Sequence, residues 1–196
     1  MIKVNISTGN TKMGHIPSVS LPPVESCRPG CPCAKKCYAV KISRIRPNVA
    51  ACYRRNLDAW RSDPKGYALQ VAAAAITTRY FRWHVAGDIP DDTYFQMMCK
   101  VAIDCPGTNF LAFTKRWDIV NPYADRIPHN LQVIYSAWGD LLPENPHELP
   151  VAHVIFRGAE PDPSWKICGG NCTDCICKGI GCWELQRGEH IAFYEH

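Results

Sequence analysis

The sequence predicts an α/β fold with a mainly parallel sheet, of which a partial (β/α) barrel is one form, and a Cys-rich C-terminal extension. The first observation is that apolar strand segments alternate with helical segments through the middle of the chain. The second is that the strand segments are apolar runs, as expected where helices cover a parallel sheet. The third is size: 196 residues with 46% hydrophobic content suffice for one core, so we expect a single domain over residues 1–196.

Two helices are predicted before the first central strand. Pro47 or Asn48 opens a helical stretch that runs through Trp60, because both residue types are common at helix starts. Asp63-Pro64 then caps a second helix, which continues through the alanine-rich segment from Gln70 to Thr78.

Four strands with intervening helices follow. Aromatic and β-branched residues dominate the strand segments, which are residues 80–86, 109–114, 131–137 and 151–156. Asp91 caps a helix that runs to about Asp104, and residues 118–126 form a short helix before Pro128. This order of elements is typical of a sheet whose parallel strands are connected by helices.

Polar side chains follow three of these strands at the point where each strand ends. His84 and Asp88 follow the first, Lys115 follows the second, and Ser136 ends the third. Since the carboxyl ends of parallel strands meet at one edge of a sheet, we expect these four residues to share a catalytic site. The alternative is that each has a separate structural role.

The first of two cysteine groups lies in a loop over residues 27–37 and has the pattern Cys27-x3-Cys31-x-Cys33-x3-Cys37. Such spacing lets one loop bring several thiolates to one centre, as zinc and iron–sulfur clusters require. We expect Cys27, Cys33 and Cys37 to be metal ligands. Cys31 closes the shell in the alternative arrangement.

The second group lies in the Cys-rich segment 165–185. Cys168, Cys172, Cys175 and Cys182 can form a complete four-thiolate shell, with Cys177 as the spare. Structural zinc sites are usually two separated C-x2-C pairs, and only Cys172–Cys175 has that spacing. We therefore expect a [4Fe–4S] cluster, with zinc as the alternative. The spacing leaves open whether the two groups hold one cluster or two.

The twelve cysteines also bear on the compartment. The N-terminal residues contain no apolar leader, and no apolar run approaches membrane-spanning length, so we expect a cytoplasmic protein without membrane contact. In a reducing compartment, this cysteine density favours metal binding over disulfides.

Positive charge is concentrated beside the first cysteine group. The net charge is +4, and the clustered cations are Lys35, Lys36, Lys41, Arg44, Arg46, Arg54 and Arg55. Nucleic acid is one candidate partner for these residues, and a solvated helix face is the alternative.

Four strings of the sequence resemble the phage-associated gene product 88 family: SLPPVESCRPGCPCAKKCYA, FRWHVAGDIPDDTYFQMM, FLAFTKRWDIVNPY and IYSAWGD. Together they extend over most of the chain. The family is carried by phages and mobile elements of bacteria, so the resemblance implies the cytoplasm of a bacterial host. It implies no particular reaction.

The loop with Cys27, Cys33 and Cys37 is also similar to the three-cysteine loop of radical S-adenosylmethionine enzymes, although its intervals differ from C-x3-C-x2-C. In those enzymes one iron stays open for the cofactor. Residues 86–90 (AGDIP) resemble the strand end that holds the cofactor's amino group, which would make Asp88 a cofactor-binding residue.

Three functions are therefore compatible with the sequence. The first is a radical-S-adenosylmethionine-like iron–sulfur enzyme with one or two [4Fe–4S] clusters and an unknown substrate. In that enzyme Lys115 would hold an anionic group and His84 would transfer a proton. The second is a zinc-binding nucleic-acid module. The third is an iron–sulfur protein that carries electrons or only supports the fold.

Overall fold

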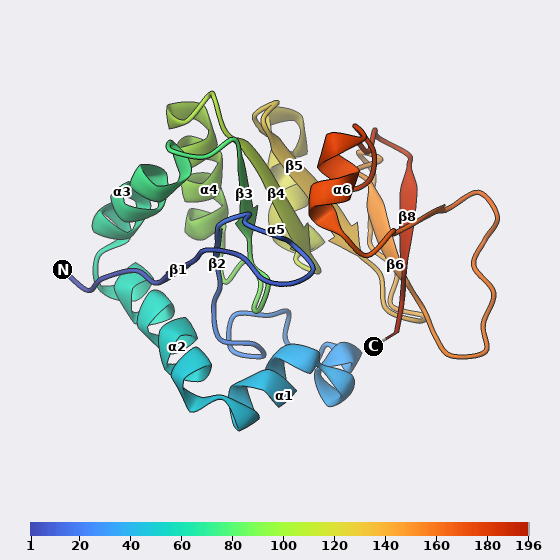
Figure 1. Cartoon of the computed structure of the whole chain (residues 1–196), viewed down its shortest axis with the longest axis horizontal. Helices are drawn as coiled ribbons and strands as arrows, with labels where there is room; N and C mark the ends of the chain where they lie inside the picture. The colour runs from blue at the N-terminus through green and yellow to red at the C-terminus, as the bar shows by residue number, and fades with distance from the viewer. Residues whose placement is uncertain (196) are drawn as a thin grey trace.

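The strands of the protein form one mostly parallel sheet (Figure 1). The computed structural model describes residues 1–195, and within them the strand order is β1-β2-β3-β4-β5-β6-β8-β7. The strands are β1 (Ile6–Ser7), β2 (Ser18–Val19), β3 (Tyr80–Trp83), β4 (Asn109–Thr114), β5 (Leu131–Ser136), β6 (Val151–Ile155), β7 (Lys166–Ile167) and β8 (His190–Tyr194). Only β1 is antiparallel to its neighbour, so the predicted parallel sheet is confirmed.

The register of the central strands brings their carboxyl ends to one edge. Trp83 of β3 lies opposite Ala112 of β4, and Thr114 of β4 lies opposite Tyr135 of β5. The sheet ends at β1 on one side and at β7 on the other, so the described strands form an open sheet.

The helices are η1 (Pro32–Lys36), α1 (Tyr38–Ile45), α2 (Pro47–Ser62), α3 (Pro64–Ala75), α4 (Asp92–Asp104), α5 (Trp117–Val120), η2 (Asn121–Arg126) and α6 (Cys172–Cys177). Five of them, α2, α3, α4, α5 and η2, pack on one face of the sheet (Figure 1). The predicted caps are present: the Asp63 side chain accepts a hydrogen bond from the Gly66 N–H, and Asp91 accepts one from the Tyr94 N–H. The main core lies between these helices and the sheet.

The opposite face of the sheet packs against the C-terminal segment. Along β4, Phe110 and Ala112 belong to the helix-side core, whereas Leu111 belongs to a second, smaller core with Leu185 and Ile191. This alternation follows from the two-residue period of a strand. The Cys-rich segment therefore lies over the face that α3 and α4 leave free.

The first central strand ends earlier than the sequence predicts. The prediction was 80–86, but β3 stops at Trp83, because His84 adopts a positive φ of 52° that leaves the extended conformation. Gly87 also has a positive φ, and a Cβ there would lie 2.6 Å from the Leu21 carbonyl oxygen. Only glycine fits this tight turn, which delivers Asp88 to the sheet edge.

No helix among residues 1–195 has the length and apolar character needed to cross a bilayer.

Candidate functional site

A cavity of about 1090 Å³ lies over the sheet face opposite α3 and α4, and both cysteine groups line it. Every residue that the sequence analysis selected for the site contributes to its wall: Cys27, Cys33, Cys37, His84, Asp88, Lys115, Ser136, Cys168, Cys172, Cys175 and Cys182. The strand-end residues come from one sheet edge, and the cysteines come from two segments more than 130 residues apart in the sequence. The fold therefore places all the candidate site residues around one cavity.

The N-terminal cysteines lie on a loop that is tied to the end of β3. The Ser26 hydroxyl donates to the Pro22 carbonyl oxygen at 2.7 Å and accepts a hydrogen bond from the Asp88 N–H at 3.1 Å. Tyr38, the first residue of α1, donates to the Val85 carbonyl. These contacts join the loop to the turn after β3, and Cys27 lies close enough to Asp88 for the carboxylate charge to affect the pKa of its thiol.

The thiols of this loop are close to one another and partly buried. The sulfur of Cys31 lies 3.0 Å from that of Cys33. Burial raises the pKa of Cys27 to about 11, and the nearby charge of Asp88 raises it further. Burial likewise raises the pKa of Cys33 to about 12. A metal centre would reverse this effect, because bound thiols are deprotonated.

The C-terminal cysteines gather around α6 and the turn that follows it. Cys172 and Cys175 lie three residues apart on α6 and so share one face of the helix. Burial raises the pKa of Cys182 to about 12, with further increases from Cys168, Cys172 and Cys175, so the four thiols are neighbours. Cys177 is exposed and does not line the cavity.

Glycine allows the backbone to pass close to these sulfurs. Gly181 has a φ of 85°, and a Cβ at this position would lie 3.2 Å from the Cys175 sulfur. The Gly170 N–H donates to the Cys168 sulfur at 3.4 Å. Backbone N–H groups directed at sulfur are the outer contacts that stabilise thiolate ligands.

Two buried N–H groups beside this group have no hydrogen-bond partner among the described residues: the Nε of Arg82 and the Nε1 of Trp183. Both side chains line the cavity, and the charge of Arg82 opposes the increase that burial causes in the pKa of Cys172 and of Cys182. An anion in the cavity, either a sulfur-rich cluster or an anionic ligand, would supply the acceptors that these donors lack. The two donors are therefore compatible with an iron–sulfur cluster and equally with an anionic ligand.

The side chains that the structure describes are not arranged for a single metal ion. Within residues 1–195, no set of three or more His, Cys, Asp or Glu side chains converges on one ion position. A four-iron cluster does not need such convergence on one point, because each thiolate binds a different iron and the thiolates stand further apart around the cluster.

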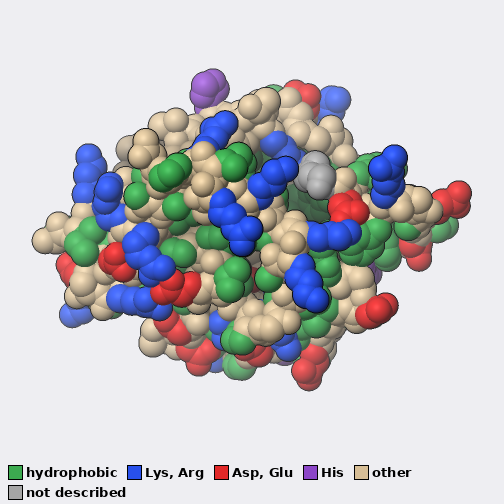
Figure 2. Space-filling view, turned by 90° about the horizontal axis from the view of Figure 1, so that it is seen from below, with side chains coloured by type: hydrophobic (Ala, Val, Ile, Leu, Met, Phe, Trp, Pro, Cys, Tyr) green, Lys and Arg blue, Asp and Glu red, His purple; other side chains and the backbone are tan. Residues whose placement is uncertain are grey.

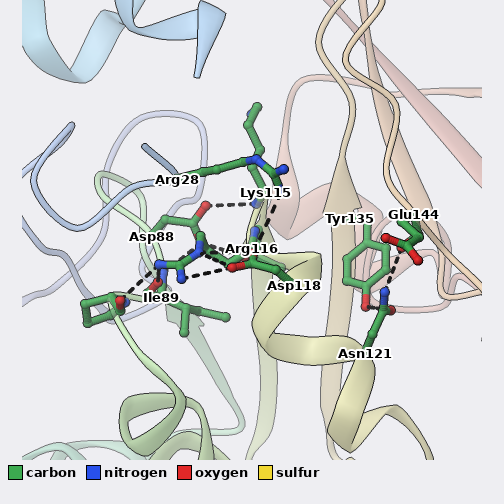
Figure 3. Close-up of polar contacts among 11 residues, drawn as sticks. Arg28, Asp88, Ile89, Lys115, Arg116, Asp118, Asn121, Tyr135 and Glu144 are labelled. Atoms are coloured by element: carbon green, nitrogen blue, oxygen red, sulfur yellow. Dashed lines mark hydrogen bonds and ion pairs between the residues drawn. The ribbon is translucent and has the colours of Figure 1, made fainter. Parts of the chain in front are cut away.

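Asp88 links the ends of β3 and β4 (Figure 3). Its Oδ1 accepts hydrogen bonds from the Thr114 hydroxyl at 2.6 Å and the Ile89 N–H at 2.8 Å, and its Oδ2 accepts one from the Lys115 N–H at 2.8 Å. Burial raises the pKa of this carboxyl, and the three hydrogen bonds oppose the shift. The predicted proximity of Asp88 and Lys115 is therefore present in the structure.

Arg116 supports the same strand ends from outside the cavity (Figure 3). Its Nη1 donates to the carbonyl oxygens of Ile89 at 3.0 Å and Pro90 at 2.9 Å, and its Nε donates to Asp118. The turn after β3 is thereby fixed to the turn after β4.

Lys115 and Ser136 contribute different parts of the wall. The Lys115 ammonium lies 6.0 Å from the centre of the Trp138 ring, and its charge opposes the increase that burial causes in the pKa of Cys27 and of Cys33. Lys115 is therefore close to the N-terminal cysteines. Ser136 is half-buried where β5 ends.

His84 differs from the other three strand-end residues. Its Nε2 lies 3.0 Å from the hydroxyl of Tyr94, a buried residue of α4, and its Nδ1 is buried without a hydrogen-bond partner among residues 1–195. Burial lowers the pKa of His84 to about 3. The imidazole is therefore neutral over the ordinary pH range and is engaged with the helix layer.

Arg82 also lines the cavity, although it is not among the site residues predicted from the sequence. Its guanidinium lies 4.5 Å from the centre of the Phe113 ring, and no ion pair or side-chain hydrogen bond of Arg82 occurs within the described part of the chain. The sequence did contain a signal for Arg82, because it is a single charged residue between two apolar residues, Phe81 and Trp83, in a strand segment.

Comparison with known proteins agrees with the resemblance seen in the sequence. No curated protein and no solved structure matches the chain. The family described as Gene product 88 matches residues 3–188. That match extends from before β1 to just before β8 and includes both cysteine groups. The chain therefore belongs to the phage-associated gene product 88 family.

Proposed function

We propose that this protein is an iron–sulfur enzyme of the radical-S-adenosylmethionine type, with one [4Fe–4S] cluster at each cysteine group. The observation that supports this most directly is that both groups line the same cavity as Asp88, Lys115 and Ser136. If the cysteines only stabilised the fold, there would be no reason for both cysteine groups to line the same cavity. In this proposal the open parallel sheet is a partial (β/α) barrel.

The proposed N-terminal ligands are Cys27, Cys33 and Cys37. Bound by three thiolates, the cluster would supply an open iron at which S-adenosylmethionine binds and is reduced. Asp88 lies close enough to Cys27 for its charge to affect the pKa of that thiol. A cofactor on this loop would therefore meet the Asp88 carboxylate.

Asp88 is suited to hold an ammonium group. A carboxylate has about four lone-pair positions, and Asp88 uses three for hydrogen bonds from this chain. The remaining position on Oδ2 can accept from a cofactor ammonium while the other bonds keep the carboxylate fixed. The Lys115 ammonium then meets an anionic group at the same wall.

His84 is not included as a proton-transfer group in this proposal. Its depressed pKa and its contact with Tyr94 support a role in shaping the end of β3 instead. Proton transfer, if the reaction requires it, would fall to a residue that faces the cavity.

The proposed C-terminal ligands are Cys168, Cys172, Cys175 and Cys182. Four thiolates complete a cluster and leave no iron open, so this cluster would carry electrons. An electron-carrying protein without a reaction is therefore the second candidate. The complete four-cysteine shell favours it, whereas the three-cysteine loop beside Asp88 favours the enzyme.

The test is anaerobic purification followed by iron and sulfide analysis. About eight irons per chain are expected for two clusters and about four for one. The reduced protein should then convert S-adenosylmethionine to 5′-deoxyadenosine, and S-adenosylmethionine should change the electron paramagnetic spectrum of the reduced protein. Full iron with neither effect would support the electron carrier. Zinc without iron would contradict both candidates.

A further inference from the structure

A basic surface lies beside the mouth of the cavity. We use this name for seven exposed cations from η1 to the middle of α2, with Arg46 at the junction of α1 and α2: Lys35, Lys36, Lys41, Arg44, Arg46, Arg54 and Arg55. Residues 26–57 contain eight of the 22 Lys and Arg residues of the chain and none of its 18 Asp and Glu residues. Figure 2 shows the side of the molecule on which α1 and α2 lie, with Lys and Arg side chains spread over it and a hollow between them.

Much of this charge is not neutralised by the protein. Glu25 pairs with Arg54 and with Arg61, and Glu195 pairs with Lys36 at 2.8 Å. Five further cations of the surface form no ion pair with any described residue: Lys35, Lys41, Arg44, Arg46 and Arg55. A cluster of like charges without counter-charges destabilises the folded chain and favours an anionic partner.

Positive charge continues from this surface into the cavity. Lys36 belongs both to the surface and to the cavity wall, and Lys115 and Arg82 lie further along the wall. The Arg82 guanidinium has a buried Nε and no acidic partner among the described residues. Because an enclosed charge without a counter-charge is costly, the cavity is built to receive an anion.

Aromatic rings accompany the charges. Tyr38, at the start of α1, is 54% exposed and lines the cavity. Trp138 lies on the wall beside Lys115. Exposed aromatic rings interleaved with cations are the usual means of binding single-stranded nucleic acid, since rings stack on bases and cations contact phosphates.

We propose that the ligand of this face is single-stranded nucleic acid. Its phosphates lie along the basic surface, and one nucleotide enters the cavity, where Arg82 contacts a phosphate or another anionic group of the strand. A duplex does not fit this arrangement, because a paired base cannot enter a cavity without leaving the stack. This deepens the proposed function by naming its substrate class.

The test is fluorescence anisotropy with labelled single-stranded DNA and RNA of about 16 nucleotides over a range of salt concentrations, using anaerobically prepared protein. The logarithm of the binding constant should fall linearly with the logarithm of the salt concentration, by about 0.7 per neutralised phosphate. The K41E/R44E/R46E variant should lose about two units of that slope and at least about tenfold in affinity. A matched variant, K65E/R79E/K100E, changes three exposed cations outside the basic surface and should bind as the unchanged protein does.

Arg82 is tested separately. Arg82→Gln should weaken binding of the single strand at unchanged iron content, and a duplex of the same sequence should bind more weakly than the strand. A change in iron content without a change in binding would instead assign Arg82 to the C-terminal cluster and overturn its part of the proposal.

Other outcomes would overturn the nucleic-acid ligand itself. These are equal losses in both triple variants, no binding at low salt, or equally tight binding of phosphatidylserine vesicles. Binding is measured without a reductant, so its failure is distinguishable from failure of the iron analysis or of S-adenosylmethionine cleavage.

Discussion

The Asp88 carboxylate accepts the Lys115 N–H at 2.8 Å and so joins the ends of β3 and β4 at the wall of the cavity. The two residues are 27 positions apart in the sequence and belong to neighbouring parallel strands. The bond fixes the backbone from which the Lys115 side chain extends toward the N-terminal cysteine loop. The Asp88 carboxylate therefore both joins the ends of β3 and β4 and positions Lys115 at the candidate site.

Asp88→Asn is expected to lower the free energy of unfolding by about 2 kcal/mol. The amide N–H₂ replaces one carboxylate oxygen, so the hydrogen bond that this oxygen accepts, from the Lys115 N–H or from the Ile89 N–H, is lost. The free energy of unfolding from denaturant titration measures the effect. Asp92→Asn, at an exposed residue in the first turn of α4, is the control and should change the free energy by less than about 0.5 kcal/mol. Equal effects of the two substitutions would contradict the role given to Asp88.

Gly87→Ala is expected to destabilise by about 2 kcal/mol or more. The new Cβ would lie 2.6 Å from the Leu21 carbonyl oxygen, and the φ of 79° is strained for any residue with a side chain. Gly107→Ala is the matched control, because Gly107 has no atom within 4 Å of an added Cβ and no positive φ. Thermal unfolding of the two variants would separate the cases, and similar melting temperatures would argue against the tight turn.

The central fold could be predicted because its signals are local and long. Residues 109–114 form an apolar run with turn residues beyond it, and β4 has those bounds. The caps of α3 and α4 were recognisable because Asp63 and Asp91 are good N-cap residues. The alternation of these elements then predicted parallel pairing.

Other parts depend on contacts that the sequence does not display. β1, β2 and β7 have two residues each, too few for a period to be visible. The end of β3 was predicted three residues too late, because Val85 and Ala86 continue the apolar pattern while the backbone at His84 leaves the strand. The sequence also does not show which side of β3 faces the cavity, so Arg82 was missed.

Cys182→Ser is expected to lower the iron content of anaerobically prepared protein from about eight to about four irons per chain, because the C-terminal shell loses one of four ligands. Cys177→Ser is the matched control, since Cys177 lies in the same segment but is exposed and outside the cavity wall. Iron and sulfide analysis with the visible spectrum measures both. A loss of iron in Cys177→Ser with none in Cys182→Ser would assign the fourth ligand to Cys177.

The last prediction concerns acid stability and His84. Burial lowers the pKa of His84 to about 3, whereas the unfolded chain has the ordinary value of about 6.5. Below pH 6.5 the unfolded state therefore binds a proton that the folded state does not bind until about pH 3, and stability falls as pH falls through this window. The limiting slope for one such group is about 1.4 kcal/mol per pH unit.

His84→Gln should remove this contribution and make the free energy of unfolding less dependent on pH between about 6.5 and 3, although the variant is less stable at pH 7 because it loses the contact with Tyr94. His129→Gln, at an exposed histidine in the turn before β5, provides the control and should keep the pH dependence of the unchanged protein. Denaturant titrations at a series of pH values measure the slopes. An unchanged slope in His84→Gln would mean that His84 is protonated in the folded state, and it would return this residue to consideration as a proton-transfer group in the cavity.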